Sequence, residues 1–106
     1  MPGKPGYVIV DVDVKDPQAY AEYRAKAPST IAAAGGRYLT RGGDVSHVEK
    51  GWDVARFVIL EFPSLAAAKA WYASPAYQAI LPIRLRSTRS RMMMVEGLEP
   101  GAPLPA

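Results

Sequence analysis

The sequence predicts a single α+β domain with the element order β-α-β-β-α-β. Three observations predict it. The length of 106 residues suits one hydrophobic core, and 49% hydrophobic with 22% charged residues is a globular composition. Four strand-like segments also alternate with helical stretches and turns. In such an order two βαβ halves interleave in one antiparallel sheet with helices on one face, which is the ferredoxin-like arrangement.

The first strand is expected over residues 7–14 (YVIVDVDV), where valine occupies every second position. Alternate side chains of a strand point to opposite faces, so the valines form one apolar face. The other face carries the remaining side chains, Tyr7, Ile9, Asp11 and Asp13. Asp16-Pro17 then predicts a helix start, because aspartate caps the first turn and proline fits the first helical position.

The first helix is expected to be interrupted by Pro28. Proline lacks the amide hydrogen that a helix interior uses, so it is predicted to kink or break the helix. Ser29 or Thr30 can cap a second short piece, which Gly35-Gly36 is expected to end.

The next elements are two strands and a helix. Residues 37–41 (RYLTR) are expected to form a short strand, closed by a Gly-Gly-Asp turn at 42–44. The clearest strand is 54–62 (VARFVILEF), which Pro63 stops. A helix is expected over 64–73, with its first serine as the cap.

A serine-proline pair, Ser74-Pro75, repeats the helix-start signal and opens a further helix over 76–86 (AYQAILPIRLR). Pro82 is expected to end or bend this helix. The last strand is expected over 91–96 (RMMMVE) and is closed by Gly97. Residues 1–6 and 99–106 are proline-rich and are expected to be extended tails around one domain at 7–98.

The sheet is expected to be buried on both faces. The segments 57–62 and 92–95 are apolar on both sides, whereas a sheet with one face in water alternates apolar and polar residues. The chain has only enough helix to cover one face. We therefore expect a second copy to cover the other face, so that two sheets packed face to face form a dimeric α/β barrel.

Three strings of residues carry a family likeness: 35–43 (GGRYLTRGG), 56–64 (RFVILEFPS) and 70–78 (AWYASPAYQ), with Arg84 after them. They resemble the family catalogued as domain of unknown function 1330, and the likeness extends over nearly all of the core, from residue 7 to about 98. The resemblance implies a ferredoxin-like domain assembled as a dimeric α/β barrel. It implies no assigned activity.

One position departs from that family's pattern. The family usually has a Glu-Gly pair before its tryptophan, whereas here Lys50 separates Glu49 from Gly51. The role of Glu49 is therefore left open.

Asp11 and Glu61 are candidate catalytic residues, because both are expected on the inner face of neighbouring central strands. Carboxylates inside a closed barrel are costly unless paired, and their pKa values rise. Such a pair can act as general acid and base or bind a cation. Alternatively, each carboxylate is neutralised by an arginine; the nearby candidates are Arg37, Arg41 and Arg56.

The candidate ligand-binding residues are guanidiniums and aromatic rings: Arg41, Arg56, Trp71, Tyr77 and Arg84. Arg41 beside Gly42-Gly43 can present a guanidinium next to free backbone amides, which suits an anion. Alternatively the glycines form a turn that needs positive φ. Trp52, Trp71 and further aromatic residues can line a pocket for a planar ligand, although helical aromatics more often form the core.

His47 is the single histidine and a third catalytic candidate, as a general base or a haem ligand. It falls in the polar connection between the second and third strands, where an exposed histidine without a special role is the alternative. With no cysteine and one histidine, no metal site is expected. The sequence also lacks a glycine-rich phosphate loop, a nucleophile elbow and a Cys/His dyad, so no cofactor is expected.

The net charge of +3 is small, but four arginines fall between residues 84 and 91 with no acid until Glu96. Such a cluster can bind phosphates or another anion, or it can be a solvated helix end. Nucleic acid is not expected as a partner, because a large basic face and a recognition motif are both missing. No apolar run is long enough to span a membrane, and no signal peptide is evident, so a cytoplasmic protein is expected.

Two functions remain open at this point. The first is a small homodimeric protein that binds or turns over a small organic, perhaps anionic, molecule without a cofactor, in a barrel interior lined by Asp11, Glu61, Arg41 and tyrosines. If such a protein is an enzyme, cofactor-independent proton transfer or oxygenation is expected. The second is a non-catalytic structural or assembly module, whose polar inner-face residues only fix the register of the dimer.

Overall fold

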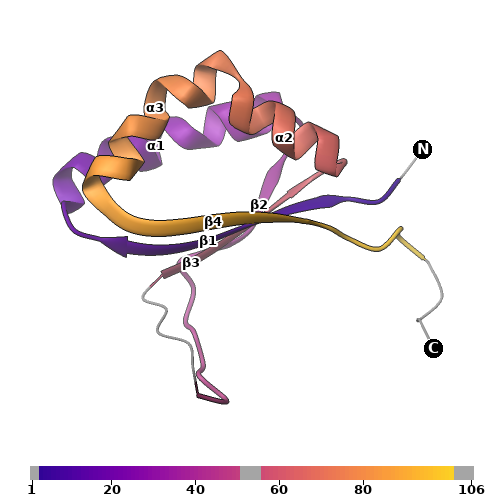
Figure 1. The fold of residues 1–106 in the computed structure, drawn as a ribbon, viewed down its shortest axis with the longest axis horizontal. Coiled ribbons are helices and arrows are strands. Elements are labelled where there is room, and N and C mark those ends of the chain that lie inside the picture. The colour runs from indigo at the N-terminus through magenta and orange to yellow at the C-terminus, as the bar shows by residue number, and fades with distance from the viewer. Residues whose placement is uncertain (1–2, 51–55, 102–106) are drawn as a thin grey trace.

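The computed structural model describes residues 3–50 and 56–101, which form two layers: a four-stranded antiparallel sheet and three helices on one face of it (Figure 1). The elements in chain order are β1 (Gly6–Val14), α1 (Pro17–Ala33), β2 (Arg37–Arg41), β3 (Arg56–Phe62), α2 (Leu65–Ala73), α3 (Pro75–Ser87) and β4 (Thr88–Glu96). The strands lie in the order β2-β3-β1-β4. The predicted ferredoxin-like order is confirmed.

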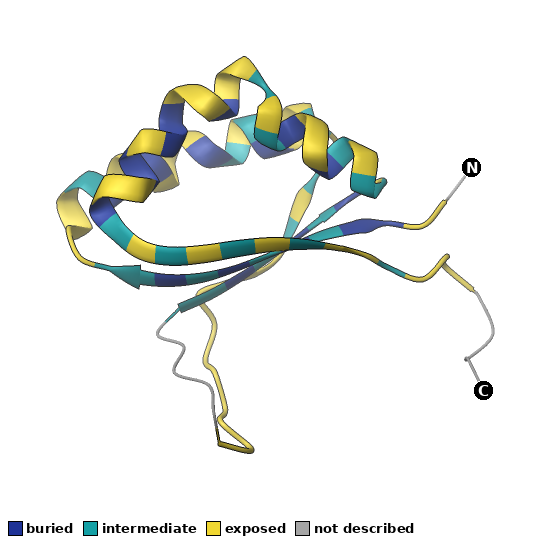
Figure 2. Cartoon of the chain, viewed as in Figure 1, coloured by how far each residue is buried: buried dark blue, intermediate teal, exposed yellow. Residues whose placement is uncertain are grey.

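The two central strands, β1 and β3, alternate between a buried and a more exposed face. Val8, Val10 and Val12 are buried under the helices, as the valine pattern predicts. Ile9 lies on the opposite face, where it pairs with Ile59 of β3 and with β4 on its other side. Figure 2 shows the buried residues gathered between the sheet and the helices. We call these two sides of the sheet the helix-facing side and the open side.

The first helix, α1, runs without a break through Pro28, so the predicted interruption is wrong. The Ser29 and Thr30 hydroxyls do not cap a second piece, because they donate to carbonyls of the preceding turn. Buried residues before and after the proline, Ala27 and Ile31, pack into the core and hold both halves in one helix. The helix ends where predicted, at Gly35, whose φ of +80° allows the closing turn.

Two further boundaries differ from the expectation. α3 continues through Pro82 to Ser87, again because buried residues on both sides of the proline pack against the core. β4 begins at Thr88 rather than residue 91, because the chain leaves α3 directly into pairing with Val14 of β1. The predicted strand over 54–62 is observed from Arg56, and its first two residues lie outside the described part of the chain.

None of the helices in the described part of the chain covers the open side of the sheet (Figures 1 and 2). Met93 and Val95 are exposed there, with 60% of Met93 accessible to solvent. The segment that follows β2 leaves the sheet on this side (Figure 1). Among the described residues, no helix is long and apolar enough to cross a membrane.

Candidate functional site

A cavity of about 30 Å³ lies between the sheet and the helices. The described residues that line it include four arginines (Arg24, Arg41, Arg56 and Arg84) and neither aspartate nor glutamate. The remaining lining residues are aromatic or aliphatic and come from β1, α1, β2, β3, α2 and β4. The cavity therefore has a strongly cationic lining within an otherwise apolar interior.

Arg84 is the deepest of the four arginines, with 4% of its surface exposed. It projects from the buried side of α3, where Nε donates to the Tyr77 hydroxyl (3.3 Å) and Nη1 donates to the Ser90 hydroxyl (2.6 Å). Among the described residues it forms no ion pair within 4.0 Å. Since a guanidinium stays charged in proteins, α3 and β4 hold a buried positive charge with neutral partners only.

Tyr77 links Arg84 to α1. Its ring is fully buried against Trp71, with the two ring centroids 4.2 Å apart, and its hydroxyl lies 2.8 Å from that of Tyr23. Burial is the main cause that raises the pKa of Tyr23 above its ordinary value, and the neighbouring Tyr77 hydroxyl raises it further. Both burial and the hydrogen bond favour the neutral phenol of Tyr23, so Tyr23 contributes no negative charge to offset Arg84 at neutral pH.

Arg56 lies on the helix-facing side of β3, and its Nε is buried without a hydrogen-bond partner among the described residues. The guanidinium rests on Gly42: a Cβ at that glycine would lie 2.5 Å from Arg56 Nη1. Gly42 also has a φ of +78°, a backbone conformation that glycine adopts without strain. Gly42 thus makes room for Arg56, a role that sequence reasoning missed because the glycine pair also fits an ordinary turn.

Arg41 closes the cavity at its edge. Its Nη2 donates to the backbone carbonyl of Arg24 in α1 (2.7 Å), and its guanidinium lies over the Tyr38 ring, 4.7 Å from the centroid. Burial raises the pKa of Tyr38 above its ordinary value. Of the described lining residues only Arg24 and Arg41 are exposed, so they mark the mouth of the cavity between β2 and α1.

Four of the five predicted ligand-binding residues line this cavity (Arg41, Arg56, Trp71 and Arg84), and the fifth, Tyr77, contacts it through Arg84. The predicted grouping of Arg41 with Asp11 and Glu61 is wrong. A register shift in β2 between Tyr38 and Thr40 turns Arg41 to the helix-facing side, opposite Val58. The amide of Gly42 is not free for an anion either, because it donates to the carbonyl of Phe57 (3.1 Å).

Asp11 and Glu61 lie on the open side, and each is paired with an arginine. Asp11 meets Arg91 of β4 at 2.6 Å, and Glu61 meets Arg37 of β2 at 2.9 Å. In the β1–β3 register Glu61 stands opposite Tyr7, four positions from Asp11, which is about 13 Å along the strands. The two carboxylates therefore do not form a shared acid–base pair within the protomer. Neutralisation by arginine fits the geometry, with Arg37 as one of the named candidates, but the partner of Asp11 is Arg91, which was not among them.

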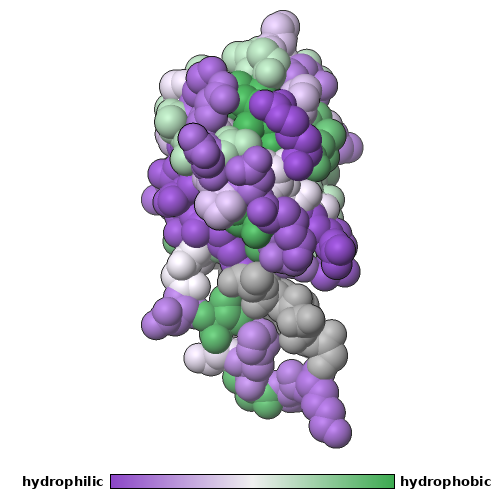
Figure 3. All heavy atoms as spheres, turned by 90° about the vertical axis from the view of Figure 1, so that its left-hand side faces the viewer, coloured by the Kyte–Doolittle hydropathy of each residue, from purple (hydrophilic) through white to green (hydrophobic). Residues whose placement is uncertain are grey.

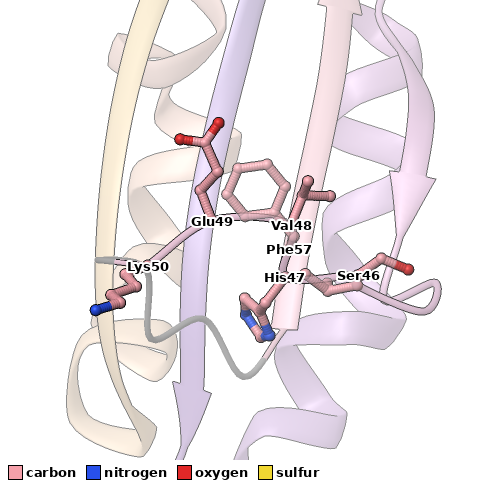
Figure 4. A pocket seen from close by; sticks show the side chains of 7 residues that line it. Ser46, His47, Val48, Glu49, Lys50 and Phe57 are labelled. Atoms are coloured by element: carbon pink, nitrogen blue, oxygen red, sulfur yellow. The ribbon is translucent and has the colours of Figure 1, made fainter.

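A second hollow, of about 420 Å³, lies on the open side between residues 45–50 and Phe57. It includes His47 and Glu49, and both are exposed. Figure 4 shows the Ser46 hydroxyl, the Glu49 carboxylate and the Lys50 amino group pointing in different directions. The polar groups of Ser46, Glu49 and Lys50 do not converge on one point in the hollow. Trp52 lies outside the described residues.

The predicted arginine cluster at 84–91 is divided by the fold. Arg84 points into the cavity, Arg86 is exposed on α3, and Arg89 and Arg91 are exposed on β4. The end of the molecule seen in Figure 3 is mostly hydrophilic, with hydrophobic atoms visible between the polar ones. Across the part of the chain that the structure describes, no group of three or more His, Cys, Asp or Glu residues could hold a metal ion.

The fold and the cavity together define a ferredoxin-like α+β protein with an arginine-lined cavity between its two layers. The chain belongs to the family described as Domain of unknown function (DUF1330), whose sequence profile matches residues 5–98. No curated protein matches the sequence significantly.

Several solved structures share this fold. A protein of unknown function from Rhodopseudomonas palustris aligns with a TM-score of 0.71 at 20% identity, over 92% of this chain and 85% of its own. A dimeric ferredoxin-like protein of unknown function from Jannaschia sp. CCS1 aligns with a TM-score of 0.65 at 17% identity, over 87% and 98%. SnoaB, a cofactor-independent oxygenase from Streptomyces nogalater, aligns with a TM-score of 0.60 at 10% identity, over 88% and 92%. These likenesses show the fold.

Proposed function

We propose that this protein is a homodimer in which each protomer binds a small organic anion in the cavity between sheet and helices. The observation that carries the proposal is the cavity lining: four arginines, with no acidic residue among the described lining residues. The lining, mostly apolar with a few polar groups, has the composition of a small-molecule site, and the volume of about 30 Å³ limits the enclosed part of the ligand to a few atoms.

The free energy of burial supports an anion as the ligand. A buried charge without an opposite partner costs several kcal/mol, and neutral hydroxyl groups offset only part of that cost for Arg84. The Arg56 Nε is a further buried donor with no acceptor among the described residues, and an unsatisfied donor of this kind costs about 1–3 kcal/mol. An anion in the cavity would supply both the missing charge and the missing acceptor.

The open side of the sheet supports the homodimer. It combines exposed apolar residues such as Met93 with ion pairs that are already satisfied within the protomer. A twofold copy of the same face would bury the apolar residues, and the ion pairs would help fix the register of the two sheets. The Jannaschia structure, described as dimeric, has the same fold.

The geometry of the cavity favours binding of the ligand over its chemical conversion. One structural neighbour is named as a cofactor-independent oxygenase, but the likeness is at 10% identity and extends to the fold. The cavity of this chain offers guanidiniums and neutral phenols, which bind and orient an anion, and the described lining residues include no carboxylate or imidazole to act as a base near pH 7.

A thermal-shift screen of organic acids tests the binding proposal, with hits confirmed by titration calorimetry. The decisive pair of variants is Arg84→Gln and Arg86→Gln, because both arginines lie on α3 but only Arg84 faces the cavity. We expect Arg84→Gln to weaken binding of a hit at least tenfold and Arg86→Gln to leave it within a factor of two. If Arg84→Gln does not fold, Arg56→Gln takes its place, since Arg56 lines the same cavity from β3. Hits that bind to the Arg56→Gln and Arg84→Gln variants as tightly as to the wild-type protein would refute the proposal.

A further inference from the structure

We infer that the group held in this cavity is the carboxylate of an organic acid, bound at Arg56, with the rest of the ligand extending past Tyr38 toward the mouth between β2 and α1. The inference rests on the proposed function and specifies the ligand class for the same site. Three features of the cavity lead to it: its volume, the hydrogen-bond donors that remain unused, and the position of its exposed residues.

The volume favours a planar group of few atoms. A cavity of about 30 Å³ has room for about two water molecules, since one water needs about 10–15 Å³ measured in this way. A carboxylate has two oxygens in one plane. A phosphate or sulfonate group carries three outer oxygens in a tetrahedral arrangement and needs more room than a planar carboxylate does.

The unused donors favour two acceptor oxygens. Arg84 already donates from Nε and Nη1 to hydroxyl groups, and Arg41 already donates from Nη2 to a backbone carbonyl. Arg56 differs, because its Nε is buried and has no partner among the described residues. Nε and a neighbouring Nη of one guanidinium form a planar fork that matches the two oxygens of a carboxylate.

The position of the exposed residues indicates where the body of the ligand lies. Apart from Arg56, the lining residues from β1 and β3 are aliphatic and buried, and Trp71 of α2 is buried as well. Toward the mouth the lining residues are Tyr38, Arg24 and Arg41. The contact between Arg41 and the Arg24 carbonyl is exposed and long-range in sequence, so a ligand can displace it at small cost. The body of the acid would then contact the Tyr38 ring.

Arginine side-chain NMR on the wild-type protein tests the inference with matched pairs of ligands. The probes are acetate, butyrate and benzoate, each compared with the methyl, propyl or phenyl phosphonate of the same body. We expect the carboxylates to shift the Arg56 Nε–Hε resonance saturably and the phosphonates to bind at least tenfold more weakly. With benzoate, we expect intermolecular NOEs from the ligand ring to the Tyr38 ring.

Matched variants locate the effect. Arg56→Gln should abolish the saturable response, whereas Arg37→Gln should leave it unchanged, because Arg37 lies on the open side and pairs with Glu61. Phosphonates that bind as tightly as carboxylates at Arg56 would overturn the carboxylate assignment and leave the binding function standing. Saturable binding with NOEs only to open-side residues such as Phe57 would also overturn it. If no probe of either class shifts Arg56, both the inference and the proposed function fail.

Discussion

The two sides of the sheet both carry arginines but differ in how their charge is balanced. On the helix-facing side, Arg56 and Arg84 lie in a cavity without an acidic residue among its described lining residues. On the open side, Arg37 and Arg91 are each joined to a carboxylate of a neighbouring strand. A charge-balanced apolar surface suits a second copy of itself, whereas an unbalanced cationic cavity suits an anion. The difference assigns a separate role to each side.

The largest expected effect comes from the core beneath the helix-facing side. Trp71 is almost fully buried, packs on Tyr77 and donates from Nε1 to the Thr30 hydroxyl (3.1 Å). Trp71→Ala should lower the free energy of unfolding by about 3–5 kcal/mol, measured by urea denaturation with far-UV circular dichroism. Lys69→Ala, an exposed change on the same helix, should stay within about 0.5 kcal/mol. A loss below 1 kcal/mol at Trp71 would contradict the packing of α2 on the sheet.

The second expected effect is a difference in stability between alanine variants of the two glycines in the turn after β2, Gly42 and Gly43. Gly42→Ala places a methyl group where the Arg56 guanidinium lies, at a positive φ, and should cost about 1–3 kcal/mol of stability. Gly43→Ala meets nothing within 4 Å and should be nearly neutral. The Arg56 Nε–Hε NMR resonance should move only in the Gly42 variant. Equal effects at both positions would show that Gly42 serves the turn alone.

The third effect concerns the open side. Met93 is 60% exposed in the protomer and lies on the edge strand β4 beside Ile9, on the uncovered face. Met93→Asp would bury an unpaired carboxylate in the proposed dimer interface and should weaken the dimer at least tenfold, about 1.4 kcal/mol, by analytical ultracentrifugation. Leu85→Asp is the control, because Leu85 is equally apolar and exposed but lies on α3. A dimer unchanged by Met93→Asp, or weakened equally by Leu85→Asp, would place the interface elsewhere.

The sequence predicted the strands and their faces well, because alternation of apolar residues follows directly from strand geometry. It placed Val8, Val10 and Val12 on one face of the first strand and Ile9 and Asp11 on the other, as observed. A break at Pro28 and a helix end at Pro82 were predicted wrongly, since the packing of neighbouring buried residues outweighs the intrinsic helix-breaking tendency of proline.

The site was harder to predict, because one irregularity in β2 decides where Arg41 points. Strict alternation over 37–41 puts Arg41 on the same side as Arg37, near Asp11 and Glu61. The register shift between Tyr38 and Thr40 reverses that, and the sequence RYLTR has no local signal for it. The arginines predicted to bind an anion therefore lie together, but on the helix-facing side of the sheet, where no site was expected.

The smallest effect is confined to alkaline pH and again concerns the helix-facing side. Burial raises the pKa of both Tyr23 and Tyr38 above the value of 10.0 expected for an exposed tyrosine. Above about pH 10 the unfolded chain therefore releases protons that the folded protein retains, and stability falls as the pH rises. The stabilisation is complete below that pH and is lost at up to about 1.4 kcal/mol per pH unit for each tyrosine. Urea denaturation between pH 9 and 11 should show a shallower decline for Tyr23→Phe than for the wild type. If the free energy of unfolding declines with the same slope in both proteins, Tyr23 has an ordinary pKa in the folded protein. The phenols around the cavity would then be more accessible to water than their packing indicates.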